Sequence, residues 1–404
     1  MVRNNKNRGR SIWTGKFLTI FTINILVNAG LYMVNTLVPK ATASLNAPVT
    51  IVGVVASTFA VTSLLSRPFV GVSGSFLRSR TILRISVSIL VAAYGLFGLA
   101  GSVSMMIVGR LMQGIGMAFV GPICLTIASN SIPRERMASG IAVFSIGQAS
   151  ANAFGPSIGL WLASNLDYGP AFFTGAALML ISLGLSLALP EDKPLNHQGF
   201  KLSLNTVFAK EALPAGVIFF FLGGAYSCVV SYVVLYGESC GIENCGIFFT
   251  AYAIFVMLSR LFSGKIGEKY GMSSVIIPGI LCYAASFYII SISHTTAMFV
   301  FAGAFSALGY GICQPSIQAL CMMQVPEERR NVAGNTCYFG VDVGYLVMPT
   351  IAGAIITAVQ NQGGSVTEGY IYMYRIMPIS ILCALVIYIF TAKKMRQRAE
   401  QQPE

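Results

Sequence analysis

Charged side chains are scarce in this sequence: they make up 10% of its 404 residues, whereas hydrophobic ones make up 55%. A chain so poor in charge cannot cover a water-soluble fold with polar surface, so we expect a protein embedded in the lipid bilayer. The alternating pattern of outer-membrane β-barrel strands is also missing from the sequence. We therefore expect helices, which satisfy their own backbone hydrogen bonds in lipid.

Side chains used in enzyme chemistry are equally few. The two histidines, His197 and His294, fall in expected loops. The sequence contains no H-E-x-x-H zinc motif, no G-x-S-x-G nucleophile motif and no glycine-rich phosphate loop. We therefore predict that the protein is not an enzyme and that it uses no cofactor and no metal site.

The nine cysteines say little about compartment. Most of them fall in apolar segments, where cysteine packs as a small hydrophobic residue. Cys240 and Cys245 are the exception, because they flank a short predicted loop. They form either a disulfide across that loop or two free thiols.

Apolar segments long enough to cross the hydrocarbon core, about 20 residues each, recur along the whole chain. Short loops rich in Pro, Asn, Asp, Gly and basic residues separate them. We predict an all-α membrane protein with twelve transmembrane helices. The predicted spans are residues 17–38, 48–70, 82–101, 103–127, 138–164, 170–190, 213–236, 246–266, 273–292, 295–322, 333–358 and 372–392.

The basic residues predict the topology. If the N-terminus is cytoplasmic, all Lys and Arg except Lys40, Arg110 and Arg375 fall on cytoplasmic tails, loops or helix ends. Cytoplasmic loops carry an excess of Lys and Arg, so we expect both termini to be cytoplasmic. The net charge of +12 therefore indicates topology and not a nucleic-acid partner. The basic start resembles a signal peptide, but no small-residue cleavage site follows it, so we expect a retained first helix.

The chain repeats itself at an offset of 193 residues. This self-similarity predicts two six-helix halves, residues 1–190 and 213–404, joined by a polar cytoplasmic linker at 191–212. Because six is an even number, both halves run in the same direction, and the axis that relates them lies along the membrane normal. The matching pairs are Arg67 and Arg260, Gly71 and Gly264, Gly116 and Gly309, Pro122 and Pro315, Pro133 and Pro326, Arg136 and Arg329, Gly147 and Gly340, and Pro156 and Pro349.

Several of these segments resemble motifs of the major facilitator superfamily, and the resemblance covers nearly the whole chain. In that family the loop after the second helix reads roughly G-x-x-x-D-R-x-G-R-R/K. The first copy here, GVSGSFLRSR at 71–80, has Ser75 in place of the acid, whereas the second, GKIGEKYGMS at 264–273, keeps Glu268. The resemblance implies the major facilitator fold of two pseudo-symmetric bundles.

Two further segments carry the resemblance. RLMQGIG at 110–116 resembles the R-x-x-Q-G motif of the fourth helix. ANAFGPSIGL at 151–160 is a partial match to the G-P-x-x-G pattern of the fifth helix, which occurs mainly in exporters that exchange substrate against protons. Its Gly155, Pro156 and Gly159 would allow a kink and tight packing. Such a feature either seals the pathway against ion leak or is a plain packing kink.

The loop motif implies a gate on the cytoplasmic side. Glycine lets two helices approach closely, and an acid binds favourably at the positive N-terminal end of a helix from the other half. We expect Glu268 to contact residues 136–139, and Ser75 to make a weaker contact near 331–334. For Arg67 and Arg260 the alternative is that they extend to lipid phosphates. The predicted gate residues are Arg67, Gly71, Ser75, Arg136, Arg260, Gly264, Glu268 and Lys269.

Two charges occur in one half only. Arg110 has Gly303 as its repeat counterpart, and Asp342 has Ala149. An ionisable residue inside the membrane is costly and is functional by default. Because burial disfavours the charged form of a carboxyl, Asp342 is a candidate proton carrier. We predict a proton-coupling or substrate role for both, as lone charges without a salt bridge to each other. For Asp342 the alternative is structural hydrogen bonding.

Polar stripes predict a cavity. Residues 24, 28, 32 and 35 lie on one face of the first predicted helix, and 335, 338, 342 and 345 share a face of the eleventh. In lipid such faces turn towards other helices or a water-filled cavity, so the alternative to cavity lining is interhelical hydrogen bonding. The predicted lining residues are Asn24, Asn28, Tyr32, Asn35, Gln113, Tyr226, Tyr310, Gln314, Gln318 and Tyr338.

The resemblance implies a multi-pass transporter of the cell membrane that works as a monomer by alternating access. The predicted cavity suits a small amphipathic organic molecule, because it is mostly polar but carries little charge. Proton-coupled export, as an antiporter, is the favoured function. The alternatives are uptake or exchange of an organic anion through Arg110, and a transport-inactive receptor on the same scaffold.

Overall fold

The computed structural model describes residues 11–47, 49–74, 77–190, 207–242 and 245–401. Within these ranges all regular structure is helical and forms twelve rods, as predicted. Ten helices are long and apolar enough to cross a membrane. The first six rods are α1 (Gly15–Ser44), α2 (Val49–Ser73), α3 (Ser79–Gly98), α4 (Val103–Ser129), α5 (Met137–Leu166) and α6 (Tyr168–Leu187).

The remaining rods follow residues 191–206, so the predicted linker lies largely outside the described residues. Two of these rods are interrupted: one by the π-helical turn η3 (Ala307–Gly311) and the other at Met377. The six rods are α8 (Leu213–Ser239), α9 (Ile247–Tyr270), α10 (Ser273–Ser291), α11 (Thr296–Ser306) continued by η3 and α12 (Ile312–Met323), α13 (Arg330–Asn361), and α14 (Val366–Ile376) continued by α15 (Pro378–Gln401).

Helix starts follow the local sequence. The side chains of Thr14, Ser102 and Thr295 accept hydrogen bonds from backbone amides three residues ahead, at the starts of α1, α4 and α11. Such caps satisfy amides that have no partner within the helix. The capping side chains in the loops therefore define where these three helices begin.

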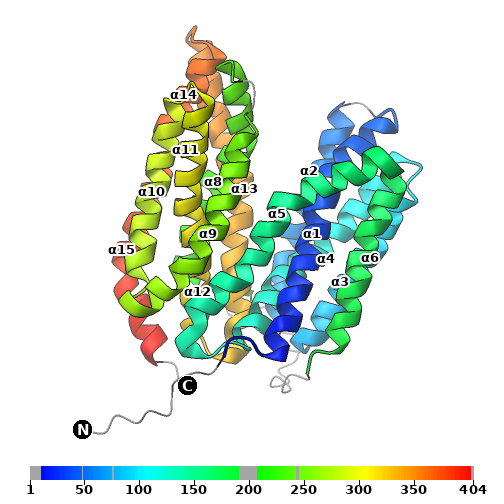
Figure 1. The fold of residues 1–404 in the computed structure, drawn as a ribbon, viewed down its shortest axis with the longest axis vertical. Helices are drawn as coiled ribbons and strands as arrows, with labels where there is room; N and C mark the ends of the chain where they lie inside the picture. The colour runs from blue at the N-terminus through cyan, green and yellow to red at the C-terminus, as the bar shows by residue number, and fades with distance from the viewer. Residues whose placement is uncertain (1–10, 48, 75–76, 191–206, 243–244, 402–404) are drawn as a thin grey trace.

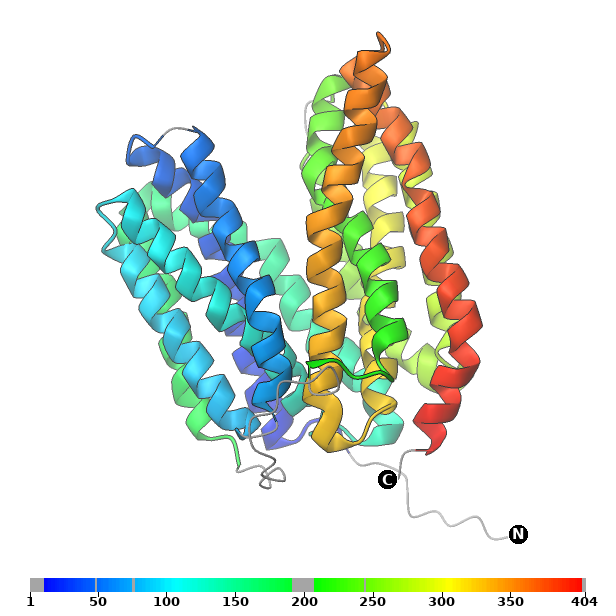
Figure 2. The ribbon, with the colours of Figure 1, turned by 180° about the vertical axis from the view of Figure 1, so that it is seen from behind.

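The helices form two bundles, α1 to α6 and α8 to α15, which stand side by side in Figure 1 and, from behind, in Figure 2. Helix α1 begins and α15 ends at the same end of the molecule, which we call the termini side; the other end is the far side. The bundles approach each other towards the termini side and diverge towards the far side. Contacts between them are made by α13 with α2 and α4, and by α5 with α9 and α12.

Two glycines bring α5 against α1. A Cβ on Gly159 would lie 2.6 Å from Met33 Cγ, and one on Gly155 would lie 2.9 Å from Tyr32 Cβ. Helix α5 continues through Pro156 without a break. The segment predicted as a kink is therefore, in this structure, a close helix-to-helix contact that positions Tyr32 beside α5.

The π turn η3 lies halfway along its rod. Gly309 in this turn packs directly against the backbone and Cβ of Tyr283 on α10, where any side chain would collide. Single π turns within α-helices are frequent at functional sites because they change the direction of side chains. Here the turn contains Tyr310, which lines the cavity between the bundles.

Candidate functional site

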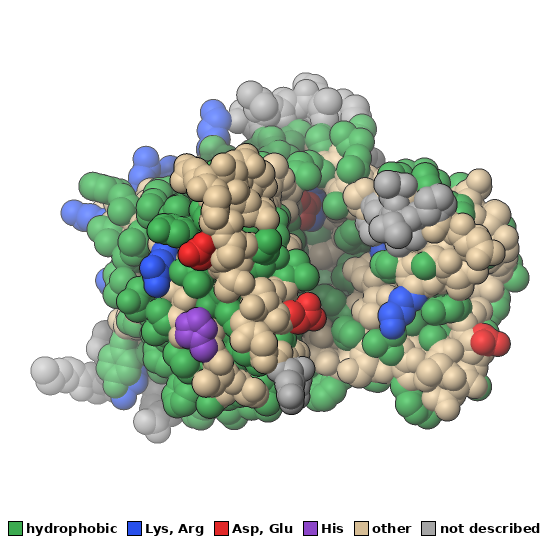
Figure 3. All heavy atoms as spheres, turned by 90° about the horizontal axis from the view of Figure 1, so that it is seen from above, with side chains coloured by type: hydrophobic (Ala, Val, Ile, Leu, Met, Phe, Trp, Pro, Cys, Tyr) green, Lys and Arg blue, Asp and Glu red, His purple; other side chains and the backbone are tan. Residues whose placement is uncertain are grey.

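A cavity of about 800 Å³ lies between the two bundles. Its wall comes from α1 and α5 on one side and from α8, α9, the η3 rod and α13 on the other. It extends from the middle of α9 to Gly246, just before α9 begins on the far side. Figure 3, viewed from the far side, shows the molecule hollowed between its two lobes. The polar lining residues are Tyr32, Gln148, Asn152, Ser157, Tyr226, Thr250, Tyr252, Arg260, Tyr310, Gln314 and Tyr345.

Tyrosines dominate this cavity. The Tyr226 ring lies at its centre, with centroid distances of 4.8 Å to Tyr310, 5.4 Å to Tyr252 and 6.3 Å to Tyr345. From the opposite bundle, Asn152 Nδ2 donates to Tyr226 Oη at 3.4 Å. A tyrosine offers an apolar ring and a polar hydroxyl, so the wall presents both kinds of surface.

Arg260 lies in the wall of this cavity, on α9. It is about 15 Å along the helix from the last residue, Tyr270, and is 4% exposed. Its Nη2 donates to Gln314 Oε1 at 3.2 Å, and Gln314 Nε2 in turn donates to Gln148 Oε1 at 3.4 Å across the bundle interface. The sequence placed Arg260 in the cytoplasmic gate; the structure places it beside the cavity, deep in the helix.

The guanidinium of Arg260 is incompletely satisfied. Its Nε and Nη1 atoms are buried and have no hydrogen-bond partner within the described residues. None of the described residues that line the cavity is acidic. Arg260 is therefore a buried cation in the wall of the cavity, without an acidic neighbour among the described lining residues.

Asp342 on α13 pairs with Arg67 on α2. Arg67 Nε lies 2.6 Å from Asp342 Oδ2, and its Nη1 donates to the Ala118 carbonyl at 2.9 Å. The guanidinium also lies 5.3 Å from the centre of the Tyr338 ring, and Asn335 Nδ2 donates to the Arg67 carbonyl at 3.0 Å. Asp342 was expected to be a lone charge, and this expectation is wrong because the bundles bring Arg67 against it. The ion pair joins the two bundles.

Arg110 is held inside the first bundle. It is 3% exposed, and its Nη1 donates to Asn35 Oδ1 at 2.6 Å and to Gln113 Oε1 at 2.8 Å. Gln113 Nε2 also approaches Tyr94 Oη at 3.4 Å. Arg110 does not line the cavity between the bundles, and within the described residues it has no carboxylate partner. Arg110, Asn35 and Gln113 therefore form a buried network that joins α1 and α4.

The other predicted lining residues divide into two groups. Tyr32, Tyr226, Tyr310 and Gln314 line the cavity. Asn24 joins α1 to α5, because its Nδ2 donates to the Phe144 carbonyl at 3.0 Å, and Asn28 Nδ2 donates to Asn24 Oδ1 at 2.9 Å within α1. Gln318 is buried on α12 outside the cavity wall, and Tyr338 packs beside Arg67.

The predicted contact of Glu268 with the start of the fifth helix is present. Glu268 Oε1 accepts a hydrogen bond from the Ser139 amide at 2.9 Å, in the first turn of α5. Gly264 makes this approach close, since a Cβ there would lie 2.5 Å from Ser139 Cα. Arg136 and Lys269 are exposed at the same end of the molecule. The carboxylate binds where helix amides have no internal partner.

The first copy of this motif is described only in part. Gly71 is buried in α2, and Ser75 lies outside the described residues. In the adjoining turn, Asn331 Nδ2 of α13 donates to the Val70 carbonyl of α2 at 3.1 Å. The last turns of α2, in the first bundle, therefore also contact the start of α13, in the second bundle.

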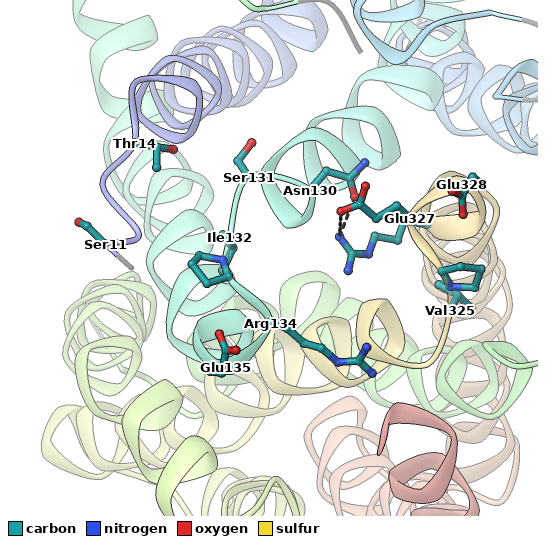
Figure 4. Close-up of a pocket in the computed structure, with 13 residues that line it drawn as sticks. Ser11, Thr14, Asn130, Ser131, Ile132, Arg134, Glu135, Val325, Glu327 and Glu328 are labelled. Carbon is teal, nitrogen blue, oxygen red and sulfur yellow. Dashed lines mark hydrogen bonds and ion pairs between the residues drawn. The ribbon is translucent and has the colours of Figure 1, made fainter. Parts of the chain in front are cut away.

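The loops after α4 and α12 meet on the termini side, around a hollow of about 780 Å³. Figure 4 shows Asn130 from the first loop beside Glu327 from the second. Arg330 Nη1 donates to Asn130 Oδ1 at 2.8 Å and to the Ser129 carbonyl at 3.0 Å. Polar contacts between the bundles thus close the termini side, whereas the cavity opens on the far side.

Comparison with known proteins identifies the family. The family model described as Major Facilitator Superfamily matches residues 20–257 and 244–404. The chain belongs to the major facilitator superfamily. It is therefore a multi-pass membrane transporter and not an enzyme, as the sequence motifs indicated.

Relatives within the superfamily are distant. The chain is 24% identical over 401 residues to the staphylopine export protein of Staphylococcus aureus, covering 94% of this chain and 96% of that one. Its fold matches the human organic anion transporter MFSD10 with a TM-score of 0.78 and 12% identity, covering 92% and 98% of the two chains. It matches the transporter FucP in the outward conformation with a TM-score of 0.77 and 15% identity, covering 97% and 100%.

The residues predicted from the sequence to line the cavity are an incomplete set. Tyr252 was not selected, although it lies two turns before Arg260 on the same face of α9, a spacing that indicates a shared surface. Gln148, Asn152 and Tyr345 lie on polar helix faces that the sequence did indicate, and they line the cavity although they were not among the predicted lining residues. Both thiols of the 240–245 segment, Cys240 and Cys245, are free in the structure.

Proposed function

We propose that this transporter exports a small amphipathic organic molecule in exchange for protons. The observation that carries the proposal is the ion pair between Arg67 and Asp342, which joins the two bundles below an open cavity. A carboxylate in that place can respond to protons and hold the bundles together at once. The staphylopine export protein, a relative over most of both chains, supports export as the direction.

The proposal includes an orientation and a working unit. Basic residues gather towards the termini side, which we assign to the cytoplasm by the positive-inside rule. The far side then faces the outside of the cell membrane, and the cavity is open to the outside. The proposed working unit is the monomer, because both bundles of this chain line the cavity.

The geometry of the ion pair supports proton coupling. Asp342 is 25% exposed, so its carboxyl is accessible to protons, whereas Arg67 is 4% exposed. Protonation of Asp342 removes the attraction to Arg67 and weakens the contact between α2 and α13. The equilibrium between the state open on the far side and a state open to the cytoplasm then shifts towards the second. The size of this shift is set by the difference between the two states in their affinity for the proton.

The chemistry of the cavity suits an amphipathic substrate. Stacked tyrosine rings supply apolar surface, and amides from both bundles supply hydrogen bonds. A volume of about 800 Å³ is within the range of cavities that hold small organic molecules. Because both bundles line it, rocking one bundle against the other changes access to the same bound molecule.

The test is transport in proteoliposomes with an imposed pH gradient, using wild type, Asp342→Asn and, as a control, the exposed acid variant Glu238→Gln. We expect gradient-driven accumulation of a transported compound by wild type and Glu238→Gln. Asp342→Asn should lose the response to the gradient but keep counterflow of labelled against unlabelled compound. Full proton-driven transport by Asp342→Asn would refute the coupling role. Saturable binding without any flux in wild type would indicate a receptor instead.

A further inference from the structure

We infer that the transported molecule is an organic acid, whose anionic group binds Arg260 and whose apolar body lies against the tyrosines of the cavity. This inference rests on the proposed function, because it assigns the substrate class of the same cavity. It differs from the expectation drawn from the sequence, which assigned any anion to Arg110.

The internal repeat provides the first argument. Arg67 and Arg260 occupy the same position in the two halves, and the counterpart of Asp342 is Ala149. Ala149 lines the cavity together with Arg260. The first arginine thus has a carboxylate from the opposite bundle, whereas the second shares a cavity wall with an alanine at the equivalent position of the opposite bundle. A substrate carboxylate would occupy the position of the absent acid.

The state of the guanidinium provides the second argument. A buried arginine without a counter-ion is unfavourable, and buried donors without partners add to the cost. Among the described residues, Nη2 of Arg260 donates to the neutral amide of Gln314, while Nε and Nη1 are buried without a partner. The planar guanidinium presents paired N–H donors that match the two oxygens of a carboxylate. A guanidinium in a cavity wall without a counter-ion among the described residues therefore fits an anionic ligand.

The remaining wall specifies the rest of the molecule. Tyr226, Tyr252, Tyr310 and Tyr345 form a continuous aromatic cluster beside Arg260. Aromatic rings favour stacking or edge contacts with another ring and cover apolar surface. Arg110 does not compete for the anion, because it lies outside this wall and already donates to Asn35 and Gln113.

The experiment measures binding of two matched fluorescent probes to the purified full-length protein in detergent. Dansylglycine carries a carboxylate, and dansylglycinamide has the same size and ring system without the charge. Hydrogen bonds to charged groups are strong enough for about a tenfold or greater preference of wild type for the acid. Emission of the dansyl group reports entry into the apolar cavity.

Three variants test the role of Arg260. Arg260→Gln should weaken binding of the acid about tenfold or more and abolish its preference over the amide. Arg260→Lys should keep part of the preference, because it retains the charge but not the planar fork. Ala149→Asp should also abolish the preference, because the new carboxylate pairs with Arg260 as Asp342 pairs with Arg67. The control is Lys265→Gln, which removes an exposed cation from the same helix and should bind like wild type.

Binding of the amide shows that each variant is folded, so loss of acid binding alone is interpretable. The inference is overturned if wild type binds neither probe or binds both equally, or if Arg260→Gln keeps the preference for the acid. The assay needs no gradient and no flux. Acid binding without transport would therefore contradict only the proposed function, whereas transport of uncharged compounds without any acid preference would contradict only this inference.

Discussion

Arg67 and Arg260 are the same residue of an internal repeat, in the same local sequence, yet their surroundings differ. Arg67 binds Asp342 and the Ala118 carbonyl, and its contacts join the two bundles. Arg260 has one hydrogen bond, to Gln314, and lines an open cavity. The difference depends on one position, which is Asp342 in one half and Ala149 in the other. Duplication supplied two buried cations, and the presence or absence of an acid gave them different surroundings.

The largest effect on stability is expected when the ion pair between Arg67 and Asp342 is broken. Asp342→Asn leaves the buried charge of Arg67 without its partner, which costs about 3 to 5 kcal/mol, whereas Arg67→Gln leaves the partly exposed Asp342 carboxylate and should cost less. The double variant should lose clearly less than the sum, because no charge remains unpaired. Thermal unfolding in detergent measures all three. Additive losses would show that the two residues do not act as a pair.

A second prediction concerns the close approach at Gly264. Gly264→Leu places a side chain against the backbone of Ser139, and overpacking of this kind costs about 1 to 3 kcal/mol. Since the contact belongs to the closed termini side, the variant should favour the state with the far side closed. Labelling of Ser157→Cys in the cavity wall by a membrane-impermeant maleimide, in a cysteine-free background, should then slow.

The control for this substitution is Gly184→Leu on α6, where a Cβ meets nothing within 4 Å. It should label at the rate of the parent protein. If Gly264→Leu also labels at that rate, the contact does not hold the closed side.

Arg110 is a third buried arginine for this comparison; its Nη1 donates to two side-chain amides, and it has no acidic partner among the described residues. Arg110→Gln should destabilise the protein by about 1 to 3 kcal/mol, because Asn35 and Gln113 lose their donor. Its preference for dansylglycine over dansylglycinamide should equal that of wild type. Loss of that preference with normal stability would move the anion site to Arg110.

The smallest expected effect is at Glu268. Glu268→Gln keeps a hydrogen-bond acceptor but removes the charge at the start of α5, an interaction of about 0.3 to 1 kcal/mol. We expect slower maleimide labelling in the cavity by a factor of about two to five. The variant Lys265→Gln, which removes an exposed cation from the same helix, should not change the rate. An equal change in both variants would indicate general surface charge and not this contact.

The sequence predicts the twelve helices well because their signal is local: apolar runs and loops are visible without tertiary information. The Glu268 contact was also predictable, since the motif places an acid, a glycine and a helix start in a fixed relation. The pairing of Arg67 with Asp342 was not, because it depends on how two bundles meet. Arg260 was misplaced for a simpler reason: α9 continues to Tyr270, four residues beyond the predicted span, so the arginine lies deeper than expected.

The most direct test of the account places Asp342→Asn and Ala149→Asp side by side in one reconstitution, with probe binding and gradient-driven flux measured for both. The account predicts that Asp342→Asn binds dansylglycine like wild type but does not respond to the pH gradient. Ala149→Asp should fail at the binding step. If both variants lose the same property to the same extent, the two arginines do not have separate roles and the account is contradicted.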